Sequence, residues 1–185
     1  LGDLVRLAKN ELTGGAFSSD GNNSRKFTLL GDPGLTLAYP DYRVVTNTVN
    51  GLSPAGGVSD TLKALSLVRV EGEVQNASGE RLEGFNGVVS PTIFDKASVL
   101  QTLSNDGPVS PVRQFELQKN IIYRGNASVT DGRFSFEFIV PKDISYSLGK
   151  GKISYYARAG EEDAHGFDTT VVVGGAADSI AADDQ

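Results

Sequence analysis

The side chains that could do chemistry in this sequence of 185 residues gather at one place. Three consecutive carboxylates, Glu161–Asp163, stand just before His165, the single histidine. Carboxylate oxygens on a loop suit Ca²⁺ better than Zn²⁺, which prefers imidazole and thiolate ligands. A solvated acidic turn between two strands gives the same pattern, and we prefer that interpretation. No metal ligand is therefore assigned, although a cation at the turn stays an open alternative.

A nucleophile and its base are missing from the sequence. The chain has no cysteine, which excludes a disulfide framework, a thiolate metal site and a cysteine nucleophile within it. One histidine leaves almost no room for a Ser-His-Asp triad, and no Gly-x-Ser-x-Gly elbow occurs. The sequence Lys150-Gly151-Lys152 lacks the upstream glycines of a phosphate-binding loop. We predict no catalytic, cofactor-binding or metal-binding residue, and no cofactor.

Two further groups of residues have a functional and a structural interpretation. Asp20–Asn23 is rich in oxygen ligands but lacks the spacing of a calcium-binding EF-hand loop, so a polar surface loop is the better interpretation. Tyr146, Tyr155 and Tyr156 could line a sugar-binding face. Alternating aromatics in a β-sandwich are more often core residues or cross-strand pairs.

Composition narrows the class of partner. The net charge is −6, with 17 Lys and Arg against 23 Asp and Glu. Nucleic-acid binding needs clustered basic residues, so we expect no nucleic-acid partner. No apolar stretch approaches the ~20 residues of a transmembrane helix, and no signal peptide is apparent. The chain begins at Leu1 and contains no Met, from which we expect a processed piece of a longer protein.

The first 40 residues predict a helix and a turn. Residues 1–12 carry one apolar stripe at helical spacing, and Gly14-Gly15 supplies a stop. No downstream helix offers the stripe a partner, so we expect its partner to be missing. Gly31–Gly34, with sequence Gly-Asp-Pro-Gly, predicts a tight turn between short strands at 27–30 and 35–38.

From Leu62 onward the pattern is that of a β protein. Short strands separated by turn signals favour an immunoglobulin-like (Ig-like) β-sandwich. The clearest hairpin turn is Asp131-Gly132, and three alternating phenylalanines after it should face one core. The expected strands are 65–74, 87–95, 99–103, 113–118, 121–124, 127–129, 133–140, 152–158 and 167–173. We expect a linker at 41–61, with a weakly alternating connecting strand at 42–49, the sandwich at 62–175 and a flexible tail or linker at 176–185.

Several segments carry a resemblance to a known family. Residues 23–35, with sequence NSRKFTLLGDPGL, resemble the closing region of the gingipain-type (C25) cysteine peptidases. The segments at 85–87, 94–96, 122–125, 131–144 and 149–157 are similar to the module that follows the peptidase domain in the type IX secretion sortase, its U component. The resemblance covers about 1–40 for the peptidase tail and 60–175 for the following module.

The resemblance implies a fold and a setting, but no active site in this chain. It implies a mainly β protein whose Ig-like β-sandwich follows a short α/β tail of a caspase-like peptidase domain. Such peptidases use a Cys nucleophile and a His base. This chain has no Cys, and His165 lies in the sandwich part, where the family's catalytic His does not map. No catalytic role is carried over.

Two hypotheses follow. In the first, the chain is a non-catalytic fragment of a cell-surface, outer-membrane-associated endopeptidase or sortase that cleaves C-terminal sorting domains from secreted cargo. Its partners would be the rest of the peptidase domain, outer-membrane secretion components and protein cargo. The sandwich would support or position the catalytic domain. In the second, the chain is a self-contained Ig-like adhesin or carbohydrate-binding module.

Overall fold

The computed structural model describes residues 1–14, 28–36, 38–54, 60–105 and 111–177, the side chains of 12–14 excepted. The chain divides into two compact units, Leu1–Tyr39 and Pro40–Gln185. Each is described by itself. No helix in the described part of the chain is long and apolar enough to cross a membrane.

The first unit is a helix tied to a turn. Helix α1 (Gly2–Gly14) forms where the apolar stripe predicted it, and Asp3 in its first turn suits the helix dipole. The Gly2 amide donates to the Pro33 carbonyl at 2.8 Å, and the N-terminal amine donates to the Leu35 carbonyl at 2.9 Å. The predicted Gly-Asp-Pro-Gly turn is present, closed by the Leu35 amide on the Asp32 carbonyl.

The two short strands expected around this turn are not found. Residues 28–30, 35, 36 and 38 belong to no strand, while 27 and 37 lie outside the described residues. A strand needs a partner for its backbone groups, and the described residues of this unit offer none. The local apolar pattern was therefore insufficient to predict strands.

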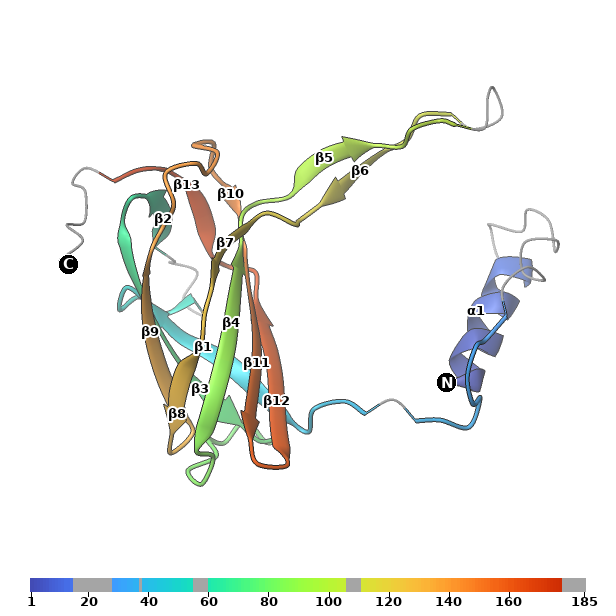
Figure 1. Ribbon diagram of the computed structural model, residues 1–185, viewed down its shortest axis with the longest axis horizontal. Coiled ribbons are helices and arrows are strands. Elements are labelled where there is room, and N and C mark those ends of the chain that lie inside the picture. The colour runs from blue at the N-terminus through green and yellow to red at the C-terminus, as the bar shows by residue number, and fades with distance from the viewer. Residues whose placement is uncertain (15–27, 37, 55–59, 106–110, 178–185) are drawn as a thin grey trace. The chain divides into compact units, whose positions relative to one another are not determined.

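The second unit is built on a closed β-barrel (Figure 1). Seven strands pair in the ring order β1-β3-β9-β8-β4-β11-β12, and β12 returns to β1. All junctions are antiparallel except β1–β12. The ring strands are β1 (Tyr42–Val49), β3 (Leu67–Gln75), β4 (Gly87–Phe94), β8 (Ala127–Thr130), β9 (Arg133–Ile139), β11 (Lys152–Ala159) and β12 (Glu162–Asp168). The prediction of a mainly β protein is confirmed, but the Ig-like sandwich is replaced by a barrel, because β4 and β11 join what would be two sheet edges.

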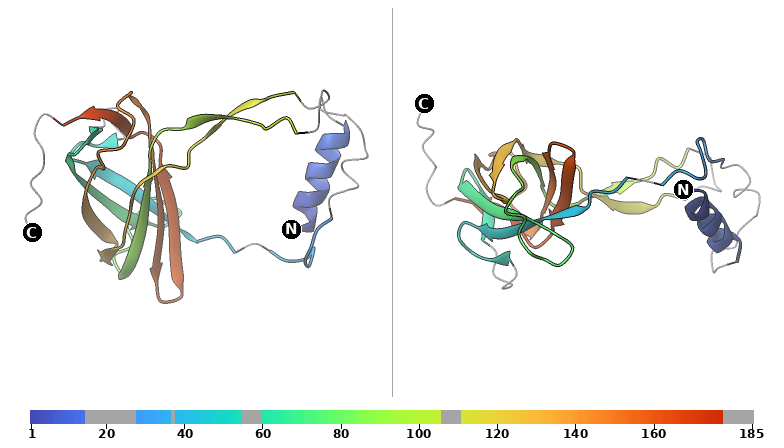
Figure 2. Two further views of the ribbon diagram at one scale, coloured as in Figure 1. Left: turned by 45° about the horizontal axis from the view of Figure 1, so that its top comes forward. Right: turned by 90° about the horizontal axis from the view of Figure 1, so that it is seen from below.

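Six short strands lie outside the ring. β7 (Ile121–Arg124) pairs with β4 on the same side as β8. A three-stranded sheet of β10 (Gly149–Lys150), β13 (Val172–Ala176) and β2 (Thr61–Ala64) lies at one end of the barrel (Figure 2). β5 (Ser98–Gln101) and β6 (Gln114–Leu117) form a sheet of their own.

The barrel interior is filled by alternate residues of its strands. On β9, Phe134, Phe136 and Phe138 are buried while the residues between them are exposed, as the sequence predicted. The Tyr123 ring stacks on Phe138 with centroids 4.7 Å apart. Tyr155 is also buried, and its hydroxyl lies 2.8 Å from the Thr46 hydroxyl. Because successive side chains of a strand point to opposite faces, every second residue of these strands lies in the core.

The structure corrects two predicted boundaries. Residues 42–49, expected within a linker, form β1, which pairs with both β3 and β12. An irregular register between Thr46 and Thr48 blurs its alternation, which made it look like a connection. The strand expected from Leu65 begins at Leu67 as β3, and the residues before it form a separate strand, β2, with Leu65 between the two at a φ of +64°. The tail expected at 176–185 lies outside the described residues from 178 onward.

Candidate functional site

The predicted acidic turn is mostly strand, and strand geometry separates its carboxylates. Only Glu161 lies in the turn, because Glu162 begins β12. The Glu162 carboxylate accepts from the Tyr42 hydroxyl at 3.4 Å, and its charge raises the pKa of Tyr42. The Asp163 carboxylate accepts from the Tyr156 hydroxyl at 3.1 Å, and this bond raises the pKa of Tyr156. Among the described residues no three carboxylate or imidazole groups are placed to hold a metal ion.

Among the described residues, none beside His165 is a nucleophile that it could activate. His165 is exposed on β12, between Tyr156 of β11 and Arg43 of β1 in the strand register. The sequence contains no cysteine for it to activate. An exposed imidazole beside a phenol and a guanidinium has no activated nucleophile to serve. The arrangement is therefore one of surface residues on a barrel.

The three tyrosines singled out in the sequence do not share a face. Tyr155 is buried, and burial raises its pKa. Tyr146 is exposed, and its hydroxyl donates to the Lys142 carbonyl at 3.3 Å. Tyr156 is exposed on the outer surface of β11. The core interpretation is right for Tyr155, and only Tyr156 stands on the barrel wall with its ring available.

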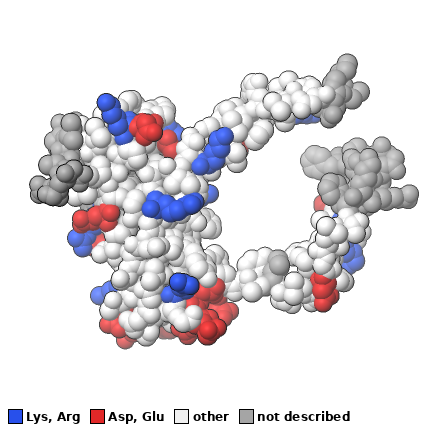
Figure 3. Space-filling model, viewed as in Figure 1, with Lys and Arg blue, Asp and Glu red and all other residues white. Residues whose placement is uncertain are grey.

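The most conspicuous exposed feature is a β-ribbon formed by β5 and β6. These strands pair only with each other, so each has an outer edge that no described strand covers. In Figures 1 and 2 the ribbon continues the β4–β7 pair beyond the barrel. Its surface is mostly uncharged (Figure 3). The exposed apolar side chains of the ribbon and its flanks are Val99, Leu103, Val112, Phe115 and Leu117.

The base of the ribbon is fixed to the barrel by a buried polar network. Asp95, only 6% exposed, is the one buried charged residue found in the described part of the chain. The Lys96 ammonium donates to its carboxylate at 2.9 Å and to the Ser145 carbonyl at 2.7 Å. Just after β6, the side-chain amide of Gln118 donates to the backbone carbonyl of Asp95 at 2.7 Å. The segments that lead into β5 and out of β6 are thus both hydrogen-bonded at the point where they leave the barrel.

Sequence reasoning predicted the two ribbon strands but not the ribbon. It expected strands at 99–103 and 113–118 and assigned both to the sandwich, since their apolar residues alternate. The sequence of β6 offered no signal against this, because its polar and apolar residues alternate as in a half-buried strand, and only the structure shows all four to be exposed. Strand propensity predicts that both segments are strands. Only the structure, in which the barrel closes without β5 and β6, shows that neither strand belongs to the core.

No family model matches the sequence, and no curated protein matches it. A solved structure does. The chain is similar to a crystal structure described as dimeric latent PorU from Porphyromonas gingivalis, with 29% identity and a TM-score of 0.65. The match covers 98% of this chain and 17% of that one, so the chain spans about a sixth of PorU.

Two weaker likenesses carry no argument. The sporulation control protein Spo0M from Bacillus subtilis matches over 74% of this chain and 50% of its own, at 13% identity and a TM-score of 0.42. A family 123 glycoside hydrolase from Clostridium perfringens matches over 68% of this chain and 27% of its own, at 14% identity and a TM-score of 0.26.

Proposed function

We propose that this chain is a non-catalytic module of a longer, PorU-like cysteine endopeptidase and sortase at the cell surface. The observation that carries the proposal is the match to PorU over 98% of the chain at 29% identity. The resemblance to the gingipain-type peptidases, seen in the sequence, points to the same parent. The absence of cysteine agrees with a module that leaves the chemistry to another domain.

The match supports a counterpart for both units. Leu1–Tyr39 makes up about a fifth of the chain, so a match over 98% includes residues of both units. We assign the first unit to the end of the peptidase domain and the barrel to the module that follows and supports it. Leu4 and Leu7 on α1 are both more than half exposed, which suits a helix that packs against the rest of that domain.

The ribbon is the element we assign to protein contact. Open strand edges with exposed apolar side chains are a ready surface for another chain. The solved PorU is described as dimeric. We extend that property to the parent of this chain and assign the ribbon to contact with a second copy. By the same resemblance, its partners include outer-membrane secretion components and the cargo whose sorting domains the parent removes.

Two simple measurements test the parent's identity. An antiserum against this chain should detect a native protein far larger than 19.5 kDa on an immunoblot of the producing cells. The purified 185-residue chain should not cleave a peptide that spans a C-terminal sorting site. A native band at the mass of this chain, or cleavage by the chain alone, would refute the proposal.

The supporting role is tested in the longer protein within its cell. Replacing Leu4 and Leu7 together by Asp should leave cargo with its sorting domain attached, since charge in place of these exposed apolar side chains of α1 opposes packing. Leu148→Asp is the control, because Leu148 is 70% exposed on the barrel unit. Normal cargo cleavage with the helix variant present at its usual level would contradict the assignment of the first unit.

A further inference from the structure

The outer surface of the barrel carries an open depression between β4, β7 and β11. Its floor consists of three small hydroxyl side chains. Ser90 and Thr92 come from β4, and Ser154 comes from β11, where it pairs with Thr92. Alternation places them opposite the buried residues of the same strands, so they face outward. The depression has a volume of about 520 Å³.

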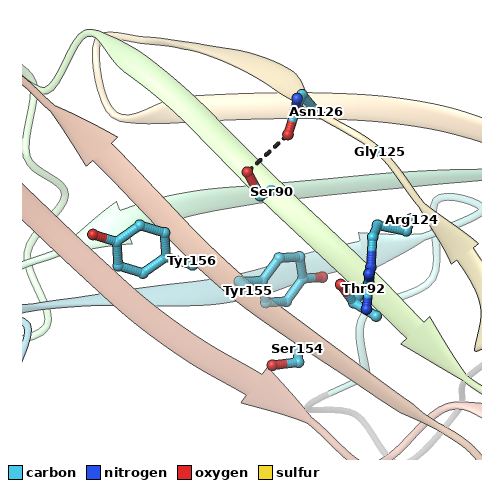
Figure 4. Close-up of a pocket in the computed structure, with 8 residues that line it drawn as sticks. All are labelled: Ser90, Thr92, Arg124, Gly125, Asn126, Ser154, Tyr155 and Tyr156. Atoms are coloured by element: carbon cyan, nitrogen blue, oxygen red, sulfur yellow. Dashed lines mark hydrogen bonds between the residues drawn. The ribbon is translucent and has the colours of Figure 1, made fainter.

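Taller side chains stand at its two ends. Figure 4 shows Tyr156 and Arg124 at opposite ends, with Ser90 and Ser154 between them. The Tyr156 ring is held in place by the bond from its hydroxyl to Asp163. Asn126 stands at the break between β7 and β8, and its side-chain oxygen lies 2.8 Å from the Ser90 hydroxyl. The depression is thus a polar floor with an aromatic wall and a cationic wall.

The guanidinium of Arg124, which forms the cationic wall, is free to bind a ligand. Among the described residues none forms a hydrogen bond or an ion pair with the Arg124 guanidinium. Another arginine of the same barrel, Arg69, pairs with Glu71 and Glu137 and serves as a comparison. A free guanidinium presents a planar fork of donors that matches a carboxylate in a bidentate manner. Arg124 is therefore available to an anionic group of a ligand.

A second hollow lies farther around the barrel. In register, Ser90 lies beside Tyr156, Tyr156 beside His165, and His165 beside Arg43. The second hollow, of about 340 Å³, is lined in part by His165 and Arg43. Because the ring of strands is closed, its outer surface curves away between the two hollows, so a ligand in the first is held by the residues between Arg124 and Tyr156.

We propose that this depression, from Arg124 and Asn126 to Tyr156, binds an acidic oligosaccharide whose carboxylate pairs with Arg124. Hydroxyl side chains exchange hydrogen bonds with sugar hydroxyls, and the apolar face of a sugar ring packs on Tyr156. The polar floor does not suit an apolar ligand. The strands that form the floor, β4 and β11, each have partners on both sides, so a peptide cannot add to either of them as a further strand. This site goes beyond the proposed function and does not depend on the parent's being a sortase.

The experiment titrates the ¹⁵N-labelled 185-residue chain with tetragalacturonate, an oligosaccharide that carries one carboxylate on each sugar, and with neutral cellotetraose. Tetragalacturonate should shift the Arg124 side-chain signal and the amides of Ser90, Ser154 and Tyr156. Arg124→Ala and Tyr156→Ala should each weaken binding by about tenfold or more, which corresponds to about 1.4 kcal/mol. Cellotetraose should bind more weakly by a similar factor.

Matched controls separate a specific site from general attraction. Arg69→Ala removes the same charge elsewhere on the barrel, and Tyr146→Ala removes an exposed ring outside the depression, so both should bind as the unaltered chain does. Ser154→Phe fills the floor from outside the core and should abolish binding with the spectrum otherwise retained. No binding of tetragalacturonate, equal binding of cellotetraose, or equal losses in Arg69→Ala and Arg124→Ala would each overturn the proposal.

Discussion

The barrel and the ribbon are made of similar strands, yet they have opposite relations to solvent. In the barrel, every ring strand has a partner on both sides and buries alternate side chains. In the ribbon, β5 and β6 have one partner each, and Phe115 and Leu117 remain exposed on β6. The difference lies in closure rather than in composition. Once β4 and β11 pair, the ring is complete and the hydrophobic effect has no core left in which to bury a further pair of strands.

Substituting one phenylalanine in each region tests this difference most strongly. Phe136→Ala removes a buried ring from the barrel core and should destabilise the chain by about 3–5 kcal/mol. Phe115→Ala removes a ring from the ribbon and should change the free energy of unfolding by no more than about 0.5 kcal/mol. Urea unfolding followed by circular dichroism measures both. Similar losses would mean that the ribbon is packed in solution.

The ion pair at the ribbon's base should behave as part of the barrel. Lys96→Met leaves the buried Asp95 carboxylate without its cation and should cost about 2–3 kcal/mol, together with faster amide exchange at the base of β5. Arg69→Met breaks an exposed pair and should cost no more than about 0.5–1 kcal/mol. If both variants unfolded at the same urea concentration, the base would be no more buried than the surface.

Two glycines distinguish tight from open backbone within the barrel unit. A Cβ at Gly87 would overlap the Arg158 carbonyl oxygen, so Gly87→Ala should cost about 1–3 kcal/mol. At Gly84 a Cβ meets nothing within 4 Å, so Gly84→Ala should be close to neutral. Thermal unfolding of both variants compares them directly. A neutral Gly87→Ala would contradict the close approach of β4 and β11 at that point.

The smallest expected effect lies on the outer surface of β3. Hydrogen bonds from the side chains of Gln75 and Asn47 hold the pKa of Glu73 below its ordinary value. A lowered pKa in the folded state contributes stability above the ordinary pKa, and this is lost as the pH falls through the folded value. Gln75→Ala should raise the pKa of Glu73, measured by ¹³C NMR of the carboxyl carbon. An unchanged titration would mean that this bond is not formed in solution.

Local patterns predicted much of the fold, and long-range pairing accounts for the rest. The alternation of Phe134, Phe136 and Phe138, the Asp131-Gly132 turn and helix α1 all follow from neighbours in sequence. Barrel closure depends on β4 meeting β11, about 60 residues later, and no local pattern encodes that meeting. Residues 162–166 were expected in a turn because Asp-Ala-His-Gly has weak strand propensity, whereas pairing with β1 and β11 makes them strand.

The candidate surfaces were harder to predict than the core. Tyr156 was singled out in the sequence, but Ser90, Thr92, Ser154 and Arg124 were not, because their neighbourhood arises only when β4, β7 and β11 lie side by side. The exclusion of a cysteine nucleophile needed only the residue counts, since a chain without cysteine cannot supply a thiol. Composition thus excluded thiol chemistry directly, whereas binding surfaces required the topology.

Hydrogen exchange compared between this chain and its longer parent tests the proposed module most directly. In the isolated chain, amides of β3 and β9 should be strongly protected, and those on the outer edges of β5 and β6 should exchange quickly. In the parent, the barrel pattern should stay the same while the ribbon amides and α1 become protected by their partners. Equally fast exchange of both elements in the parent would contradict the roles assigned to them.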